Sequence, residues 1–402
     1  MISVVWGSEY LDLFLNTCLP TQLGEGNVPA LPSGSRYRIL TRAADVAGIQ
    51  RHATVQALAR MIPVDVVAVE AFEELEGDER QPDAGQGDRR FDLVTACNRV
   101  GIRDGVKAGA ALMFPSPDYV MSANAFDAIV RRHREGYRAV ACIGLRLAKE
   151  PFLQSVQAAG GLSGAPSPRE LVRMAMPHLH AHTRSLFADA RAFNTYPLGV
   201  YWPVGGDGLL GRSFHVHPIM VDPMRPSAMP KLTIDSDYLV KAVPDFARVH
   251  VVTDSDEFIV FELTEADRSF RSATGTAVAL WRAAAMAARS DEFGVQYFQR
   301  YPVRIHGGDA GEHWSDAEAS AAGFVRAVMR RTAPFGTAWP RWYRWIERAH
   351  HLRGQSRRAW RRSVPSLRTK QVARAVRVAR SRASRVFKRT RKLFGNAGVI
   401  PP

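Results

Sequence analysis

Acidic residues are missing from the C-terminal part of this 402-residue chain. The last of them is Glu347, whereas sixteen lysines and arginines lie between Arg353 and Lys392. Without those sixteen, 38 basic residues face 39 acidic ones, so residues 1–352 have a net charge near −1. The net charge of +15 therefore does not indicate a basic protein throughout. We expect a nearly neutral body and a basic C-terminal segment with separate functions.

Cysteine is scarce, and long apolar runs are missing. The three cysteines Cys18, Cys97 and Cys142 are far apart, which excludes a disulfide framework or a cysteine-based zinc site. No apolar run approaches the ~20 residues that span a bilayer. Residues 1–6 lack the basic and apolar regions of a signal peptide. These features predict a reduced, cytoplasmic protein.

Motifs of several enzyme classes are also missing. The first apolar run ends in Gly7-Ser8-Glu9-Tyr10, which is neither a P-loop nor a G-x-G-x-x-G sequence. There is no nucleophile elbow, no H-E-x-x-H motif and no Cys/His pairing. The sequence therefore argues against a P-loop enzyme, a Rossmann dehydrogenase, a hydrolase or a protease.

What is present is an alternation of short apolar runs with helical patterns over the first 150 residues. Such alternation predicts right-handed βαβ units, and hence an α/β fold with a mixed, mainly parallel sheet flanked by helices. Residues 201–263 favour strands and loops, and Ser315 with Glu318 predicts the capping box of a helix over 315–331. We expect one domain over 1–335 and an aromatic and basic helical tail over 336–402. The predicted strands of the first part are 2–6, 37–40, 64–70, 110–114 and 138–143.

The ends of the first two predicted strands carry residues suited to a nucleotide diphosphate. Ligands of parallel sheets bind at the carboxyl ends of the strands. Trp6 offers an aromatic face, Gly7 allows close approach, and Thr41 and Arg42 follow the second strand. An ordinary set of strand-end residues explains the same pattern equally well.

The order of elements resembles the GT-A glycosyltransferases, which have the nucleotide-diphospho-sugar transferase fold. The likeness lies in the helix over residues 98–107 and the run Ala110 to Ser122 that follows it. In that family a D-x-D motif at this junction holds Mn²⁺ or Mg²⁺ against the diphosphate. Here Ser116-Pro117-Asp118 takes its place, so only the second acid is kept. The resemblance implies nucleotide-binding roles for Lys107, Ser116 and Asp118, and a metal-binding role for Asp118.

A second local likeness lies in residues 305–314. Ile305-His306-Gly307-Gly308 and Trp314 resemble a segment of retaining GT-A enzymes whose histidine completes the metal shell. This resemblance implies that His306 is a metal ligand. A glycine-rich turn between a strand and a helix would give the same pattern.

Three polar clusters lie between these motifs. Phe214-His215-Val216-His217 alternates, so a strand there would place both imidazoles on one face. Two Asp-Ser-Asp sequences, at residues 235–237 and 254–256, offer carboxylates two residues apart. Hard cations such as Mg²⁺ prefer ligands of this kind. An Asp-rich turn, in which the side chains bond their own backbone, has the same sequence pattern. We expect a polar site that binds metal or supplies a base for an acceptor hydroxyl. Its residues are His215 and His217 as metal ligands, with Asp235, Asp254 and Asp256 as catalytic residues.

The basic tail has a thin apolar stripe, with Val372, Val376, Ala379 and Ala383 at steps of three or four. A basic amphipathic helix of this kind adsorbs to anionic lipid. We expect residues 353–392 to bind an anionic membrane surface, with a disordered arm and nucleic-acid binding as the alternatives.

Together these features favour a glycosyltransferase at the cytoplasmic face of the inner membrane, in the synthesis of cell-surface glycans. It would transfer a sugar from a nucleotide sugar to a saccharide, lipid-linked or protein acceptor. The alternative is a non-catalytic GT-A-like adaptor whose tail binds membrane or nucleic acid.

Overall fold

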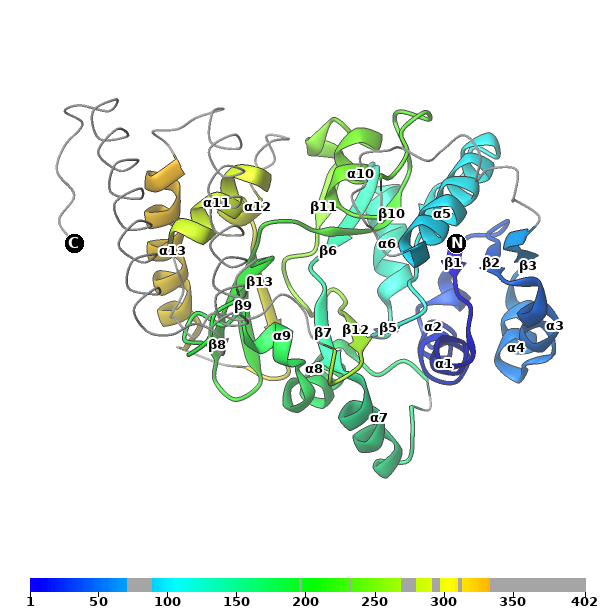
Figure 1. Cartoon of the computed structure of the whole chain (residues 1–402), viewed down its shortest axis with the longest axis horizontal. Coiled ribbons are helices and arrows are strands. Elements are labelled where there is room, and N and C mark those ends of the chain that lie inside the picture. Colours follow the sequence, from blue (N-terminus) through cyan, green and yellow to red (C-terminus); the bar gives the residue numbers. More distant parts are fainter. Residues whose placement is uncertain are drawn as a thin grey trace, which may run out of the picture. The chain divides into compact units, whose positions relative to one another are not determined.

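The computed structural model describes residues 1–70, 89–162, 164–194, 197–231, 233–268, 280–290, 297–309 and 313–332. These residues form a mixed α/β protein of several small sheets flanked by helices (Figure 1). The chain divides into two compact units, Met1–Trp339 and Pro340–Pro402, and every described residue belongs to the first. The predicted tail helix lies outside the described residues.

The first sheet is entirely parallel and has the order β1-β2-β3. Its strands are short apolar runs, and Ile39 and Leu40 of the central strand are fully buried. Helices α3 and α4 lie beside β3 (Figure 1). The strands are β1 (Ile2–Val4), β2 (Tyr37–Thr41) and β3 (Val64–Ala68). The helices of this region are α1 (Ser8–Leu13), η1 (Phe14–Cys18), α2 (Leu19–Gln22), η2 (Val28–Ala30), α3 (Ala43–Arg51) and α4 (Ala53–Met61).

The second sheet is mixed and has the order β11-β6-β10-β4, with β10 antiparallel to β6 and β4. The hydroxyl of Ser3 connects it to the first sheet. Ser3 Oγ donates to the carbonyl of Pro115, just after β4, at 2.6 Å and lies 2.7 Å from Tyr37 Oη of β2. The strands are β4 (Leu112–Met113), β6 (Ala139–Cys142), β10 (His217–Val221) and β11 (Val249–Val251).

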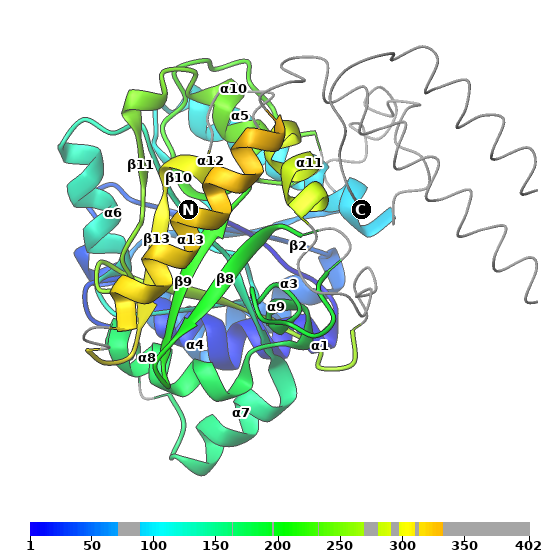
Figure 2. The ribbon, with the colours of Figure 1, turned by 90° about the vertical axis from the view of Figure 1, so that its left-hand side faces the viewer.

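Two three-stranded sheets complete the described strands. In the order β5-β12-β7, β12 is antiparallel to β5 and parallel to β7. The order β13-β9-β8 is antiparallel throughout, and α13 packs across β8 and β9 (Figure 2). The strands are β5 (Tyr119–Met121), β7 (Leu145–Ala148), β8 (Gly199–Val204), β9 (Gly208–Ser213), β12 (Val260–Thr264) and β13 (Pro302–His306).

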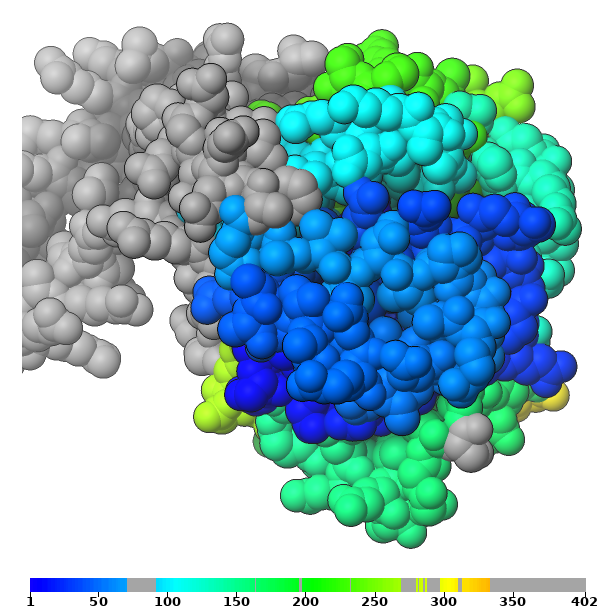
Figure 3. All heavy atoms as spheres, turned by 90° about the vertical axis from the view of Figure 1, so that its right-hand side faces the viewer, coloured from blue at the N-terminus to red at the C-terminus, as the bar shows by residue number. Residues whose placement is uncertain are grey.

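Helices cover these sheets from several sides. Figure 3 shows the face where the side chains of α3 and α4 lie between α5 and α7. One cluster of buried apolar side chains runs through the described elements, with Phe14, Phe126 and Phe261 fully buried in it. The remaining helices are α5 (Arg89–Lys107), α6 (Ala125–Arg134), α7 (Lys149–Ala158), α8 (Pro168–Ala175), η4 (Met176–His178), α9 (Ala181–Arg184), α10 (Ser236–Ala242), η5 (Phe246–Arg248), α11 (Leu280–Ser290), α12 (Tyr297–Arg300) and α13 (His313–Thr332).

The sequence predicted the mixed α/β class and the early strands, but not how the strands divide. The expected single, mainly parallel sheet is replaced by four small sheets among the described residues. Helix α13 begins at His313, so Ser315 is a helical residue and not the predicted cap. Of the described helices, none combines the length and the apolar composition that crossing a bilayer requires.

Candidate functional site

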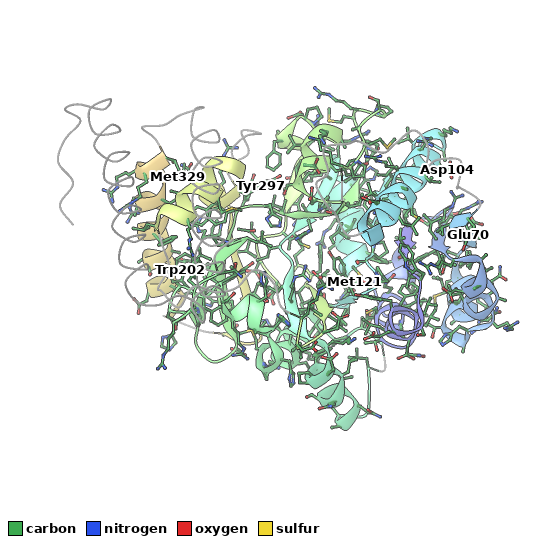
Figure 4. All side chains as sticks on the ribbon, in the orientation of Figure 1. Glu70, Asp104, Met121, Trp202, Tyr297 and Met329 are labelled. Atoms are coloured by element: carbon green, nitrogen blue, oxygen red, sulfur yellow. The ribbon has the colours of Figure 1, made fainter. Side chains whose placement is uncertain are left out.

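The carboxyl ends of the parallel strands bring Trp6, Gly7 and Arg42 together, as the sequence predicted. The guanidinium carbon of Arg42 lies 5.9 Å from the centroid of the Trp6 ring, within the range of a cation–π contact. Gly7 has φ of +83°, which favours glycine, and its N–H donates to Asp45 Oδ2 at 3.4 Å. Glu70, labelled in Figure 4, follows β3 and accepts from the N–H of Ala43 at 2.8 Å. We call Trp6, Gly7, Arg42, Asp45 and Glu70 the strand-end edge.

Two predicted nucleotide-binding residues lie elsewhere. Thr41 is fully buried at the end of β2, so its side chain faces the interior and does not line an open site. Lys107 ends α5 and precedes β4, whereas Ser116 and Asp118 follow β4. Lys107 and Asp118 therefore flank this strand from opposite ends, and the structure does not join Lys107 to the strand-end edge.

Side-chain contacts connect the residues that follow β1 with the residues that follow β7 and β12. Tyr10 Oη donates to Glu265 Oε1 at 3.3 Å, and Lys149 Nζ lies 2.5 Å from Glu9 Oε1. The Lys149 side chain is only 10 % exposed, whereas that of Glu9 is 68 % exposed, so this ion pair lies at the protein surface. Because Glu9 and Tyr10 closely follow Trp6 and Gly7, the strand-end edge continues towards the sheet β5-β12-β7.

Asp118 is half-buried, and its carboxylate is hydrogen-bonded within the turn that follows β4. Ser116 Oγ donates to Asp118 Oδ1 at 2.6 Å. Burial raises the pKa of Asp118, and the hydrogen bond from Ser116 and the charge of Arg146 oppose that rise. Its backbone carbonyl accepts from the N–H of Leu263 at 2.9 Å, which ties Asp118 to β12.

Arg146 of β7 is the centre of a polar cluster that the sequence analysis missed. Its Nη1 donates to Glu262 Oε1 and, at 3.0 Å, to Thr264 Oγ1, both on the neighbouring strand β12. Burial raises the pKa of Glu262 to about 8, and the charge of Asp118 adds to the rise. We call the group Asp118, Arg146, His215, His217, Glu262 and Thr264 the Arg146 cluster.

The two histidines of this cluster lie next to each other, as predicted, although not on one strand. His215 precedes β10 and His217 begins it, and their ring centroids are 5.0 Å apart in an edge-to-face arrangement. Burial, with the charge of Arg146 as a second cause, lowers the pKa of His215 to about 4. Burial, then His215 and Arg146, lower the pKa of His217 to about 3. Both imidazoles are therefore uncharged at neutral pH.

A third histidine, His182 of the short helix α9, also lies near Arg146. Thr183 Oγ1 donates to the Arg146 carbonyl at 2.9 Å, and Asn194 Nδ2 lies 3.2 Å from His182 Nδ1. Burial, followed by the charge of Arg146, lowers the pKa of His182 to about 4. Two carboxyl groups and several neutral imidazoles thus lie around Arg146.

The residues around Asp118 do not fit the divalent metal that the GT-A resemblance implies. One carboxylate stands where the motif has two, and one of its oxygens already accepts from Ser116. Among the described residues, the only set of three or more His, Cys, Asp or Glu whose ligand atoms lie within 4.8 Å of one another is Asp254, Asp256 and His306. Neither Asp118 nor the predicted ligands His215 and His217 belong to it. The metal shell predicted from Asp118, His215, His217 and His306 is therefore not assembled.

Asp235 is held as a helix cap. It is the N-cap of α10 and accepts from the N–H of Asp237 at 3.0 Å. Burial, with the adjacent Asp237 carboxylate, raises its pKa. Ser236 Oγ accepts from the N–H of Val216 and donates to the carbonyl of Val216, both at 2.9 Å. Asp235 is thus placed near the two histidines, but its contacts explain it as a structural residue.

Asp254, Asp256 and His306 meet where the loop after β11 runs beside the end of β13. His306 Nε2 lies 3.0 Å from Asp254 Oδ1, and the N–H of His306 donates to Ser255 Oγ at 3.1 Å. His306 is 8 % exposed, and its Nδ1 has no hydrogen-bond partner in the structure. Asp254 Oδ1 also accepts from the N–H of Asp256 at 2.9 Å, which is the Asp-rich turn considered as the alternative.

A guanidinium already occupies part of this second group. Arg169 of α8 donates to both oxygens of Asp256, at 2.9 and 2.8 Å, and to Asp309 at 2.9 Å. The hydrogen bond from Arg169 lowers the pKa of Asp256. A divalent cation would have to displace Arg169 before it could use both carboxylates.

The sequence did carry a signal for the Arg146 cluster. Leu145-Arg146-Leu147 and Phe261-Glu262-Leu263 each place one charge between two apolar residues, and the two charges are opposite. In two adjacent strands such triplets put both charges on one face and pair them. Lys149, the first residue of α7, and Glu265, which directly follows β12, gave no such signal.

A comparison of this chain with protein-family models, curated proteins and solved structures finds no match.

Proposed function

We propose that this protein is a glycosyltransferase that moves a sugar from a nucleotide sugar to a saccharide, lipid-linked or protein acceptor. The observation that carries the proposal is the chain of polar contacts that leads from the strand-end edge, through Tyr10 and Glu265, towards the Arg146 cluster. An aromatic ring and a guanidinium at one end suit a base and its phosphates. Polar, half-buried side chains at the other end suit a hydroxyl-rich group.

The arrangement supports a GT-A-like fold as part of this proposal. Helix α5 leads into β4, and Ser116 to Asp118 follow β4 directly, in the order that the resemblance implies. Trp6, Gly7 and Arg42 follow the first two strands of a parallel sheet. Because the residues around Asp118 do not fit a metal, the proposal routes no step through a cation. Asp254 and Asp256 stay candidates for the acceptor side.

Nucleotide binding tests the proposal directly. Calorimetry and thermal shift with UDP-, GDP- and CMP-sugars, each with and without Mn²⁺, should show one nucleotide class that binds. Arg42→Ala should weaken that binding by about tenfold, which corresponds to roughly 1.4 kcal/mol. Arg304→Ala is the matched control, because Arg304 lies 5.4 Å from the ring of Trp314 in a similar contact. A folded protein that binds none of these compounds would refute the proposal.

We further propose that the enzyme works at the cytoplasmic face of the inner membrane and that residues 353–392 hold it there. The support is the sequence alone, sixteen basic residues with no acidic one. Removal of residues 350–402 should abolish sedimentation with anionic vesicles and leave nucleotide binding intact. Equal sedimentation of the shortened chain would contradict this assignment.

The second candidate is a non-catalytic GT-A-like adaptor whose tail binds membrane or nucleic acid. The single carboxylate at the position of the D-x-D motif favours it. Asp118→Asn distinguishes the two, since a transferase should lose turnover in the variant whereas an adaptor should behave as the unmodified protein in cells.

A further inference from the structure

The sheet β5-β12-β7 has one apolar and one polar face. Glu262 is paired in register with Tyr119 of β5 and with Arg146 of β7, so these three side chains form a row across the sheet. Their neighbours Phe261 and Leu263 point to the opposite face and are buried. Met121, labelled in Figure 4, lies on β5 of this sheet. The polar row therefore lies on the face opposite Phe261 and Leu263, although Tyr119 at one end of it also packs against the core.

The row is shielded but not closed off. The Arg146 side chain is 24 % exposed and the Glu262 side chain 19 %. Thr264, two residues after Glu262, extends the same face and accepts from Arg146 Nη1 at 3.0 Å. Asp118 directly precedes Tyr119 and adds a second carboxyl group at the end of the row.

The positive charge of this face is largely balanced within the protein. Arg146 is bonded to Glu262 and Thr264, so its charge is shared with groups on the adjacent strand. The imidazoles of His215 and His217 lie within the electrostatic reach of Arg146. A tyrosine, a threonine and neutral imidazoles each offer both hydrogen-bond donors and acceptors.

We propose that this polar row is the sugar-binding surface and that it selects an uncharged sugar over one that carries a carboxylate. The inference rests on the proposed function and adds the substrate class. Sugar hydroxyls match side chains that donate and accept. A sugar carboxylate would meet Asp118 and Glu262, and the nearest guanidinium is already bonded to Glu262, so desolvation of that carboxylate would be poorly compensated.

The test uses two donors that differ in one group. UDP-glucose carries CH₂OH where UDP-glucuronate carries a carboxylate, and UDP alone measures the nucleotide share of binding. Calorimetry on the full chain should show UDP-glucose binding at least about tenfold more tightly than UDP-glucuronate. GDP-mannose and GDP-mannuronate replace this pair if the protein binds GDP.

The two proteins are compared at pH 9, above the pKa of Glu262, where Glu262→Gln removes one negative charge and keeps an acceptor of the same size. We expect the preference for the uncharged sugar to shrink to about threefold, mainly through tighter binding of the uronate. Glu135→Gln is the matched control, because Glu135 pairs with Arg132 on the separate helix α6 and should leave the preference unchanged.

The outcomes separate the two proposals. Equal binding of the two donors, or an unchanged preference in Glu262→Gln, overturns the inference and leaves the proposed function standing. Binding of CMP-linked sialic acid alone also overturns it, because that sugar carries a carboxylate. If no nucleotide or nucleotide sugar binds, the proposed function fails and the inference fails with it.

Discussion

Glu257 and Glu262 are two glutamates of one segment, both largely buried and both bonded to an arginine, yet their pKa values move in opposite directions. Burial would raise the pKa of Glu257, but hydrogen bonds from His250 and Arg132 overcome it and lower the pKa to about 2. Burial and the charge of Asp118 raise the pKa of Glu262 to about 8 despite Arg146.

The difference lies in what surrounds each pair. Glu257 accepts from Arg132 Nε at 2.6 Å and lies 2.9 Å from His250 Nε2. Near Glu262, the charges of Arg146 and Arg268 lower the pKa and the charge of Asp118 raises it. The first arrangement stabilises a charge, and the second leaves a charge poorly compensated. Poorly compensated buried charges are more typical of functional sites than of structural ion pairs.

The largest effect should come from Glu257→Gln. The lowered pKa means that the carboxylate stabilises the fold fully above about pH 4.5, and that this contribution is lost as pH falls towards 2. At pH 7 the variant should lose about 3 kcal/mol of unfolding free energy in urea titrations followed by circular dichroism. An unchanged stability at pH 7 would show that Glu257 is not held as its contacts indicate.

Glu262→Gln should change the pH dependence of stability in the opposite sense. A raised pKa makes the folded protein hold its proton, so the unmodified protein should lose stability as pH rises from about 4.5 to about 8. The loss between pH 5 and pH 8.5 should be smaller in the variant by about 2 kcal/mol. The comparison uses the change in unfolding free energy between the two pH values within each protein. A pH-independent loss of stability in the variant, caused by the weakened bond to Arg146, therefore cancels. Parallel curves would contradict the role of burial at this position.

Asp118→Asn should sharpen the comparison by removing the neighbouring charge. The pKa of Glu262 should then fall, so the pH-dependent loss of stability should have its midpoint at lower pH and be smaller by about 1 kcal/mol at pH 8.5. Urea titrations across this pH range measure both quantities. A midpoint that does not move would mean that burial alone sets the pKa of Glu262.

Glu318→Gln should have the smallest effect and serves as a reference. Its pair with Arg304 is exposed, with side chains 39 % and 46 % accessible. Exposed pairs contribute little, so unfolding free energy should stay within about 0.5 kcal/mol of the unmodified protein. A loss comparable to that of Glu257→Gln would show that burial does not explain the comparison.

The sequence predicted the parts of the site that depend on local order. Trp6, Gly7 and Arg42 follow parallel strands, and strand ends meet whatever the details of packing. Thr41 shows the limit of this reasoning, because the alternation along a short strand did not reveal that its side chain is buried. Asp235 shows a second limit of this reasoning. An Asp-Ser-Asp sequence is equally typical of a helix N-cap and of a metal-binding or catalytic site, and here it caps α10.

The whole Arg146 cluster could not be assembled from the sequence, because its members come from distant segments and from two different sheets. Arg146 and Glu262 are 116 residues apart, and the neighbouring contact of Tyr10 with Glu265, outside the cluster, joins residues that are 255 apart. Which strands pair depends on the packing of the whole domain. The same reason separates His306 from Asp118, since His306 ends β13 whereas Asp118 directly precedes β5 of another sheet.

The hydroxyl of Ser3 has a consequence for how the protein meets a ligand. By bonding to Pro115 and Tyr37 it fastens the strand that precedes Trp6 to the turn that precedes Asp118. The spacing between the two ends of the proposed surface is thus set before any ligand arrives. Such preorganisation spares the ligand the entropy of bringing the two ends together. The buried hydroxyl of Ser3 would in this way set the distance between the two ends of the proposed binding surface, and hence the length of the ligand that fits it.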